Sequence, residues 1–387
     1  LLLDLWPLSR WKTSRWKTNN TENNEEPVRF TQRSFIGLCM EKLPLIVLCV
    51  FFMGLAWFFK SQTGNIVSSD IFPLDVRIAN AIDAYAIYAR QMVWPNDLQF
   101  FYPHDHLLNN GKGIPFSHWG VSLVIVLAIS VLAVWQIRKR PYLFVGWCWF
   151  LGVLVPAIGL VQIALYARAD RYMYIPMLGL TIVFVQLLEE MLSRLPARRT
   201  LAAVSGLLVI AGLTVVAIPQ AESWRNSLAL CQHALSIDEN NYTAMINLGN
   251  YLRKRDAAND EERRRNAEIS LHYLEKAKAI MPGYGPVYNN LGLTLLVLNR
   301  EEQALEAFRK NQEIDPKFVF PYGRIANMYF RKGNYEKVIE SLQELVKRQE
   351  VSADPDREHS WTKMAYCYRR MNDESKALEF DRKVYAL

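Results

Sequence analysis

Five stretches of this sequence are too long and too apolar to be ordinary elements of a soluble domain. They occupy 43–59, 120–137, 142–163, 174–192 and 201–218, and each has about 17 or more mostly apolar residues, the lower limit for a helix that crosses a bilayer. The first residues, LLLDLWPL, look like the end of a further span. Length and composition together predict an all-α bundle of about five full transmembrane helices plus a partial one at the N-terminus.

The composition of the chain changes after residue 218. Residues 222–387 are charged and helix-favouring, so we predict two domains, 1–218 and 222–387, in a chain of 387 residues. The sequence begins without methionine and without a signal-peptide pattern. We interpret it as the C-terminal part of a longer protein.

Cysteine spacing and net charge argue against several classes of function. The five cysteines are widely spaced and form no CxxC or zinc-ligand pattern, so neither a disulfide framework nor a metal site is predicted. The net charge of +7 comes largely from basic clusters beside the apolar runs, which is typical of membrane topology and does not indicate nucleic-acid binding.

The positions of these basic clusters predict the orientation of the spans. Lys and Arg are enriched in short cytoplasmic loops, and they gather here at 10–33, 138–140 and 194–199. The longer segment 61–117 and the segment 164–173 contain few basic residues. We therefore predict that these two segments, and everything after residue 218, lie in the periplasm of a bacterium or the lumen of the endoplasmic reticulum.

Residues 77–94, RIANAIDAYAIYARQMVW, have apolar residues at helical spacing interrupted by Arg77, Asp83 and Arg90. A helix of this kind lies in the membrane interface more readily than it spans the bilayer. A sixth full span here would also move the basic cluster at 138–140 to the outside. We therefore predict an interfacial helix.

The second half of the chain repeats itself. The pair Leu291-Gly292 matches Ile325-Ala326 at a spacing of 34 residues, the tetratricopeptide period. The same pair recurs, after insertions, as Leu248-Gly249 and Met364-Ala365. A small or branched residue falls where the two helices of each hairpin should cross, namely Ser270, Ala304, Val338 and Ala377. The pattern predicts a solenoid of about four helical hairpins, with a further helix over 224–235 preceding it.

Tetratricopeptide solenoids commonly bind peptides on the row of first helices. Asn247 and Asn290 lie directly before Leu-Gly pairs. Asn250 directly follows Leu248-Gly249, and Asn327 directly follows Ile325-Ala326. Because a side-chain amide both donates and accepts, such residues can hold a peptide backbone. We predict that these four asparagines bind an acceptor peptide, with ordinary polar surface residues as the alternative.

Two predicted external motifs carry candidate chemistry. WPNDLQFFYPHDH, 94–106, includes Tyr102, His104, Asp105 and His106, which form a possible active-site loop able to hold a metal or move a proton. The alternative is a solvated loop beneath an aromatic belt.

The motif ALYARADRYMYIP, 164–176, places charges between two spans. Arg168 and Arg171 are three residues apart, and guanidinium groups bind phosphate oxygens in a bidentate manner. Asp170 is predicted to orient them, and Tyr172 to contact lipid or sugar. The alternative is an Arg–Asp pair that closes a tight loop.

The stretch GWCWFLGVLVPAIGLVQIALYARADRYMYIPMLG, 146–179, with FYPH before it and the repeats after it, resembles the transmembrane and tetratricopeptide repeat-containing proteins, which are related to protein O-mannosyltransferases. The resemblance covers nearly the whole chain. It implies the C-terminal part of a type-C membrane glycosyltransferase, which transfers a sugar from a polyprenyl-phosphate carrier to a protein outside the cytoplasm.

Type-C enzymes carry their catalytic carboxylates in a first external loop that precedes this part of the family. The resemblance thus implies that the catalytic residues lie upstream of residue 1 and that this chain supplies donor- and acceptor-binding groups. It implies a lipid-linked sugar as the donor substrate and no cofactor. It does not decide whether a divalent metal takes part. A non-catalytic membrane scaffold, whose solenoid docks a partner protein, is the alternative hypothesis.

Overall fold

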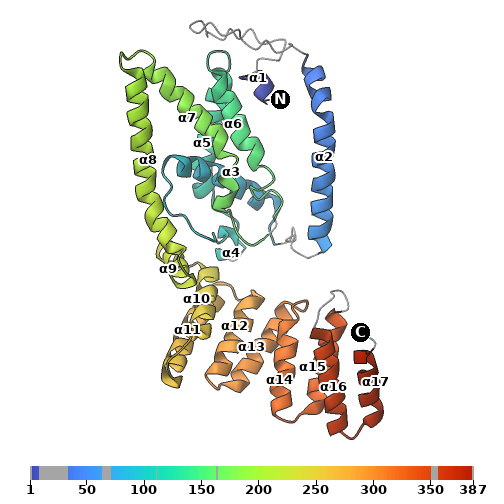
Figure 1. The fold of residues 1–387 in the computed structure, drawn as a ribbon. Coiled ribbons are helices and arrows are strands. Elements are labelled where there is room, and N and C mark those ends of the chain that lie inside the picture. Colours follow the sequence, from blue (N-terminus) through green and yellow to red (C-terminus); the bar gives the residue numbers. More distant parts are fainter. Residues whose placement is uncertain are drawn as a thin grey trace. The chain divides into compact units, whose positions relative to one another are not determined.

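The computed structural model describes residues 2–7, 34–62, 71–109, 111–162, 164–349 and 356–385. Within these ranges all regular elements are helices, which confirms the predicted all-α fold (Figure 1). The chain divides into two compact units, Leu1–Trp224 and Arg225–Leu387. The basic cluster predicted at 10–33 lies outside the described residues.

The first unit contains nine helical elements in its described residues. They are α1 (Leu2–Leu5), α2 (Phe35–Gln62), α3 (Leu74–Val93), α4 (Asp105–Leu108), α5 (Phe116–Trp135), α6 (Pro141–Leu154), the 3₁₀ turn η1 (Asp170–Met173), α7 (Met177–Leu192) and α8 (Arg198–Ser223).

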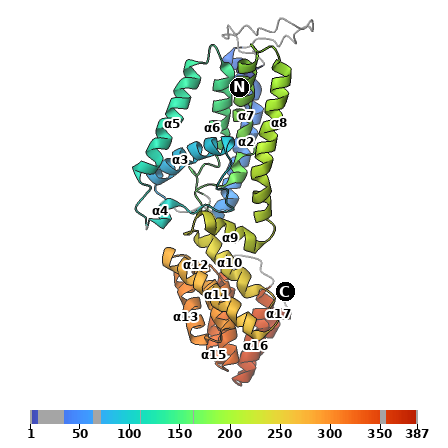
Figure 2. The ribbon, with the colours of Figure 1, turned by 90° about the vertical axis from the view of Figure 1, so that its left-hand side faces the viewer.

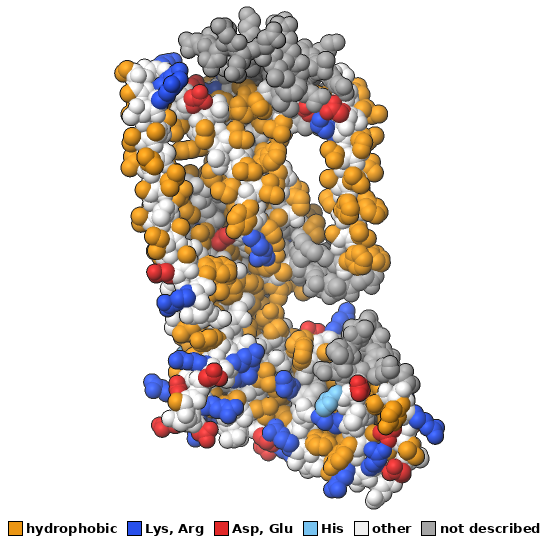
Figure 3. Space-filling model, in the orientation of Figure 1, with side chains coloured by type: hydrophobic (Ala, Val, Ile, Leu, Met, Phe, Trp, Pro, Cys, Tyr) orange, Lys and Arg blue, Asp and Glu red, His pale blue; other side chains and the backbone are white. Residues whose placement is uncertain are grey.

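Three of these helices are long and apolar enough to cross a membrane. The qualifying stretches are Ile36–Ala56 in α2, Phe116–Trp135 in α5 and Arg198–Ser223 in α8, and they coincide with the runs predicted at 43–59, 120–137 and 201–218. Most of their side chains are exposed, with only 6%, 17% and 0% of the most apolar window buried. Figure 3 shows hydrophobic side chains covering the length of α2 and α8. Apolar surfaces of this extent fit lipid or another protein far better than water.

The two remaining predicted spans form shorter helices. The apolar run 142–163 predicts a continuous helix, but α6 ends at Leu154 and has 14 residues, and α7 has 16. Pro156 has no backbone N–H to continue the helix, and Gly159 adopts a left-handed φ of 96°. The irregular segment between α6 and α7 therefore begins earlier than the predicted loop at 164–173, and it carries the residues of the candidate site.

The helix α3 lies over the core of the first unit and runs across the direction of α5, α6 and α7 (Figure 2). Its Ala81, Ala84 and Tyr88 are buried against residues of α5 and α6, including Phe150 and Leu154. Small alanines let α3 approach closely, and the buried aromatic rings fill the remaining space. α3 is not among the helices that are long and apolar enough to cross a membrane. Its placement in the membrane interface stays a prediction.

The second unit is a stack of helical hairpins preceded by one helix, α9 (Figure 1). Its helices are α9 (Ser227–Ile237), α10 (Tyr242–Lys254), α11 (Asp260–Ile280), α12 (Gly285–Val297), α13 (Glu301–Ile314), α14 (Phe320–Arg331), α15 (Tyr335–Gln349), α16 (Asp356–Arg370) and α17 (Glu374–Tyr385).

The predicted crossing residues lie at the centre of each hairpin. Ser270, Ala304, Val338 and Ala377 are all completely buried. At Gly292 an added Cβ would collide with the ring of Phe308, which explains why glycine occupies the second position of the Leu-Gly pair. A small residue on the first helix leaves room for a side chain of the second helix, such as Phe308 opposite Gly292, so the repeat pattern follows from packing.

Candidate functional site

The two predicted external motifs form one site in the first unit. The backbone N–H of Ala167 donates a hydrogen bond to the carbonyl of Tyr102 at 2.9 Å, and Pro103 and Tyr166 form an isolated antiparallel bridge. The loop after α3 and the loop before α7 therefore lie side by side. No local sequence pattern indicates that these two segments are in contact.

Tyr102 joins the two loops through its side chain as well. Its hydroxyl donates to the carboxylate of Asp170, with distances of 2.9 and 2.8 Å to the two oxygens, and accepts from the backbone N–H of Gln99 at 2.9 Å. The guanidinium of Arg168 lies 4.0 Å from the centre of the Tyr102 ring, a cation–π contact. Arg168, Asp170 and Tyr102 therefore form one cluster, in which Asp170 contacts the tyrosine directly.

This cluster holds a carboxylate in an unfavourable environment. Burial raises the pKa of Asp170, and the hydrogen bond from Tyr102 and the charge of Arg168 offset only part of that rise. Burial, followed by the nearby charge of Asp170, raises the pKa of the Tyr102 hydroxyl as well. A carboxylate kept in such a place despite its cost is more typical of a functional site than of a surface loop.

The helix α3 fixes the loop from its other side. The hydroxyl of Tyr88 accepts from the Ala169 N–H at 3.0 Å and donates to the Ala169 carbonyl at 2.9 Å. The side-chain amide of Asn80 donates to the Ala167 carbonyl at 2.9 Å. Sequence reasoning missed both residues. Their spacing of eight, which places them on one face of a helix, was the available signal.

Arg171 occupies a different position from Arg168. Its side chain is exposed, and its guanidinium lies 5.6 and 5.2 Å from the ring centres of Tyr166 and Tyr172. Among the described residues it forms no ion pair with a carboxylate. The hydroxyls of Tyr166 and Tyr172 hydrogen-bond to each other at 2.6 Å.

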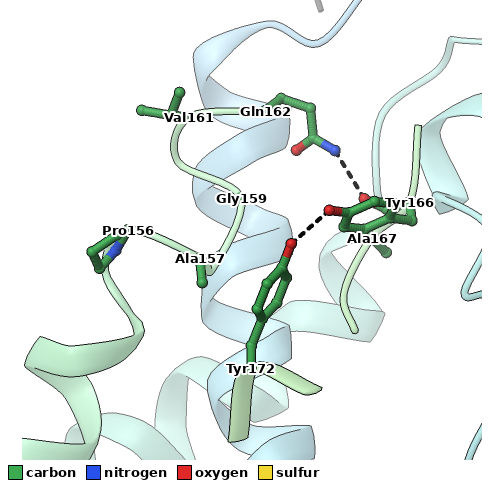
Figure 4. A pocket seen from close by; sticks show the side chains of 8 residues that line it. All are labelled: Pro156, Ala157, Gly159, Val161, Gln162, Tyr166, Ala167 and Tyr172. Carbon is green, nitrogen blue, oxygen red and sulfur yellow. Dashed lines mark hydrogen bonds between the residues drawn. The ribbon is translucent and has the colours of Figure 1, made fainter. Parts of the chain in front are cut away.

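These two tyrosines line a pocket of roughly 230 Å³, together with Pro156, Ala157, Gly159, Val161, Gln162 and Ala167 (Figure 4). Gln162 is 3% exposed, and its amide nitrogen donates to the Tyr166 carbonyl at 2.8 Å. Its amide oxygen is buried and has no hydrogen-bond partner among the described residues. The pocket thus offers an acceptor, two phenol groups and, at the neighbouring Arg171, a cation.

The histidines of the first motif serve as packing and capping residues. His104 is completely buried, its ring centre lies 4.5 Å from that of Phe72, and its Nδ1 accepts from the His106 N–H at 3.3 Å. Burial, with a smaller contribution from His106, lowers the pKa of His104 to about 4. His104 is therefore neutral at physiological pH and begins α4 as its N-cap.

The remaining residues of that motif form contacts with residues other than Asp170. His106 is buried, and its Nδ1 accepts from the Gly113 N–H at 3.0 Å. Asp105 is near His118, with 3.7 Å between Oδ2 and Nδ1. The part of the chain that the structure describes contains no group of three or more His, Cys, Asp and Glu side chains arranged to hold a metal ion.

The four predicted peptide-binding asparagines lie on the first helices of the hairpins. Asn247 and Asn327 are exposed, and Asn327 accepts from Lys363 at 2.6 Å. Asn250 accepts from Arg253 at 2.6 Å, while the amide of Asn290 donates to the Pro286 carbonyl of its own helix at 2.9 Å.

Replacing Tyr102 by phenylalanine should loosen the contact between the two loops. The variant loses the donor to Asp170 and the acceptor of the Gln99 N–H, and one such buried hydrogen bond stabilises by roughly 1 kcal/mol. Hydrogen exchange of the Ala167 amide, measured by mass spectrometry, should become several-fold faster. Tyr174, which is 76% exposed, provides the control, because Tyr174→Phe should leave this exchange unchanged. Equal rates in wild type and Tyr102→Phe would contradict the role given to the hydroxyl.

Comparison with known proteins supports the resemblance inferred from the sequence. A tetratricopeptide repeat family model matches residues 285–318 and 321–351. Human protein O-mannosyl-transferase TMTC3 is 24% identical over 265 residues, which cover 65% of this chain and 28% of that protein. The mouse protein of the same name is 25% identical over 235 residues, 58% of this chain and 24% of its own length. The chain is thus similar to this family, carries tetratricopeptide repeats, and spans about a quarter of the curated relatives it matches.

Solved structures also match part of the chain. A crystal structure of MamA covers 41% of this chain and 85% of its own, with 16% identity and a TM-score of 0.34. MamA from Desulfovibrio magneticus RS-1 covers 44% of this chain and 90% of its own, with 19% identity and a TM-score of 0.35. YrrB, described as a tetratricopeptide-repeat protein with an unusual peptide-binding site, covers 44% and 79%, with 19% identity and a TM-score of 0.32.

Proposed function

We propose that this chain, which is similar to protein O-mannosyl-transferase TMTC3, is the donor- and acceptor-binding part of a membrane protein glycosyltransferase. Its donor is a sugar carried on polyprenyl phosphate, and its acceptor is a polypeptide held by the repeats. The observation that carries this proposal is the exposed guanidinium of Arg171 beside a tyrosine-lined pocket, with no carboxylate paired to it among the described residues.

The two arginines take different roles in this proposal. Arg171 binds the donor phosphate directly, because an exposed guanidinium with no carboxylate partner among the described residues can offer two N–H groups to one oxyanion. Arg168, stacked on Tyr102, keeps the loop in place and adds positive charge. Asp170 orients this arrangement through Tyr102 and does not act as the catalytic base.

The pocket beside Arg171 suits the sugar or the first part of the carrier. Tyr166 and Tyr172 offer aromatic faces with hydroxyls, and the unpartnered oxygen of Gln162 can accept from a sugar hydroxyl. An inverting displacement also needs a carboxylate to activate the acceptor hydroxyl. In this proposal that group comes from the segment that precedes this chain in the family, and Asp170, already occupied by Tyr102, is not a substitute for it.

The distribution of Lys and Arg supports a location for this chemistry. It favours a multi-pass protein in which the loop before α7, the loop after α3 and the repeats all face the periplasm or the endoplasmic reticulum lumen. A lipid-linked donor and a polypeptide acceptor then meet in one compartment.

A second candidate function is a non-catalytic membrane scaffold whose repeats dock a partner protein. The match of the family model to the repeats favours it, because tetratricopeptide solenoids are protein-binding modules. Paired acidic residues soon after the first span of the complete protein would favour the enzyme, and their absence would favour the scaffold.

Binding of the lipid carrier tests the proposed donor site without requiring catalysis. The chain in detergent micelles is titrated with polyprenyl phosphate, and bound carrier is measured by native mass spectrometry. Arg171→Ala should weaken binding about tenfold or more, since a charge-assisted hydrogen bond contributes roughly 1.5–3 kcal/mol. In the complete enzyme the same variant should abolish sugar transfer.

The matched control removes an exposed arginine from the predicted cytoplasmic cluster. Arg138→Ala, on the segment after α5, should bind the carrier as wild type does. Thermal unfolding of the repeats should be identical in all three proteins. Full carrier binding by Arg171→Ala, or an equal loss in Arg138→Ala, would rule out a specific phosphate site at Arg171.

A further inference from the structure

Three of the four first helices of the hairpins carry no negative charge, and the fourth, α16, carries both signs. The first helices α10, α12 and α14 contain no Asp or Glu at all, and they carry Arg253, Lys254, Arg324 and Arg331. The second helices carry both signs. Their acidic residues are Asp260, Glu261, Glu262, Glu268 and Glu275 on α11, Glu301, Glu302, Glu306 and Glu313 on α13, and Glu336, Glu340 and Glu344 on α15, and their basic residues are Arg263, Arg264, Arg265, Lys276, Lys278, Arg309, Lys310, Lys337, Lys347 and Arg348. Positive charge without acidic residues on these three helices indicates a negatively charged partner.

Arg253 is the most informative residue of the first-helix row. Its side chain is half-buried, and its Nε is enclosed without a hydrogen-bond partner. Its one direct contact by hydrogen bond within the described residues is with the neutral amide of Asn250. A half-buried guanidinium normally has a carboxylate to offset its charge, and here the described residues provide none.

A second arginine increases the positive charge at this place. Burial lowers the pKa of Arg253, and the charge of Arg324 lowers it further. Arg324 is exposed on α14, two hairpins along the chain from Arg253 on α10, and α12 packs against α10 between them. The two like charges are thus close enough for Arg324 to disfavour the charged form of Arg253.

The row continues at α16 with a third cation. Lys363 donates to Asn327, and its ammonium lies 5.5 Å from the ring centre of Phe330. Phe330 and Tyr366 lie 5.5 Å apart, between ring centres. The face thus combines cations, amides and aromatic rings, a set suited to an extended acidic polypeptide with side chains of mixed character.

We propose that the first-helix row of the repeats binds an acidic segment of a polypeptide, with its carboxylates at Arg253 and Arg324 and its backbone along the asparagines. This inference rests on the proposed peptide-binding role of the repeats and adds the chemical class of the peptide. Bound carboxylates supply the counter-charge that α10, α12 and α14 lack, and the amides of Asn247 and Asn327 hold the backbone.

The test compares labelled peptides binding to the full chain in detergent micelles, followed by fluorescence anisotropy at low salt. A peptide of alternating glutamate and serine should bind about tenfold or more tightly than the same peptide with glutamine in place of glutamate. Added salt should remove most of this preference. Arg324→Glu, at an exposed position, and Arg253→Gln should each reduce the preference several-fold, and the double variant should abolish it.

Arg264→Glu on α11 is the matched control, because Arg264 is exposed on a second helix and should not affect binding. Circular dichroism checks that the variants keep their helices. Equal binding of the glutamate and glutamine peptides would overturn the acidic preference while leaving the peptide-binding role intact. Failure of every peptide to bind would overturn the peptide-binding role and this inference with it.

Discussion

Replacing Gly146 by leucine should separate α6 from α7 and cause one of the largest stability losses in the first unit. An added Cβ at Gly146 would collide with the Gly179 carbonyl oxygen and lie 2.5 Å from Cγ2 of Val183. A Cβ at Gly179 would in turn meet the backbone of Gly146 and lie 3.0 Å from Trp149. Backbone cannot yield as a flexible side chain can, so we expect a loss of about 3 kcal/mol or more.

Cys148 on α6 provides a local measurement of this loss. Its thiol is free and half-buried, and its labelling rate, read by mass spectrometry, should rise about a hundredfold for a loss near 3 kcal/mol. Gly152→Leu is the matched control on the same helix, since an added Cβ there meets nothing within 4 Å. Similar labelling in Gly146→Leu and Gly152→Leu would show that the close contact of α6 and α7 does not hold this unit together.

The repeat half was predictable from the sequence almost residue by residue. Ser270, Ala304, Val338 and Ala377 were singled out by spacing alone, and each is completely buried. The reason is physical: stacked hairpins impose the same steric limit at the same position of every repeat, so the limit appears as a period. The Leu-Gly pairs on the first helices follow the same steric limit, because an added Cβ at Gly292 would collide with Phe308 of the second helix.

The membrane half was predictable in outline only. Hydropathy located α2, α5 and α8 because lipid selects for length and apolar composition. It did not locate the end of α6 at Leu154, because the residues after it, Val155 to Leu160, remain apolar while Pro156 and Gly159 break the helix. Apolar composition reports burial or lipid contact, and it does not report backbone conformation.

The candidate site was predictable as a set of residues but not as an arrangement. Charge within an apolar context singled out Arg168, Asp170 and Arg171. The Tyr102–Asp170 hydrogen bond joins residues 68 positions apart, and no local pattern encodes such a distant pairing. Likewise, the burial of His104 against Phe72 depends on a tertiary contact that local sequence does not announce.

Replacing Arg168 by methionine should destabilise the loop before α7 through the charge that remains at Asp170. The arginine stacks on Tyr102 and is the near cation that lowers the pKa of Asp170. Methionine keeps the apolar contact with the ring but leaves the carboxylate without this counter-charge. We expect a loss of about 2 kcal/mol at neutral pH, because the charge of a half-buried carboxylate is then no longer offset by the nearby guanidinium.

The pH dependence of this loss identifies its cause. The native pKa of Asp170 already lies above its ordinary value of 3.8, and the variant should raise it further. A raised native pKa means that the folded state binds the proton more tightly than the unfolded state does. The resulting stabilisation of the fold is fully present below the pKa of the unfolded state and is lost as the pH rises through the native pKa. The deficit of Arg168→Met should therefore be large at neutral pH and shrink as the pH is lowered.

A second substitution separates charge from packing. Asp170→Asn keeps an acceptor for the Tyr102 hydroxyl but carries no charge, so adding it to Arg168→Met should restore most of the lost stability. Hydrogen exchange of the Ala167 and Ala169 amides, both held by hydrogen bonds across the site, measures the loop directly. A deficit that is independent of pH and survives Asp170→Asn would assign Arg168 to packing alone. A deficit that disappears in the double variant would show that Asp170 is tolerated in this loop because Arg168 offsets its charge. This result is expected of a carboxylate that is retained for the function of the site and not for stability.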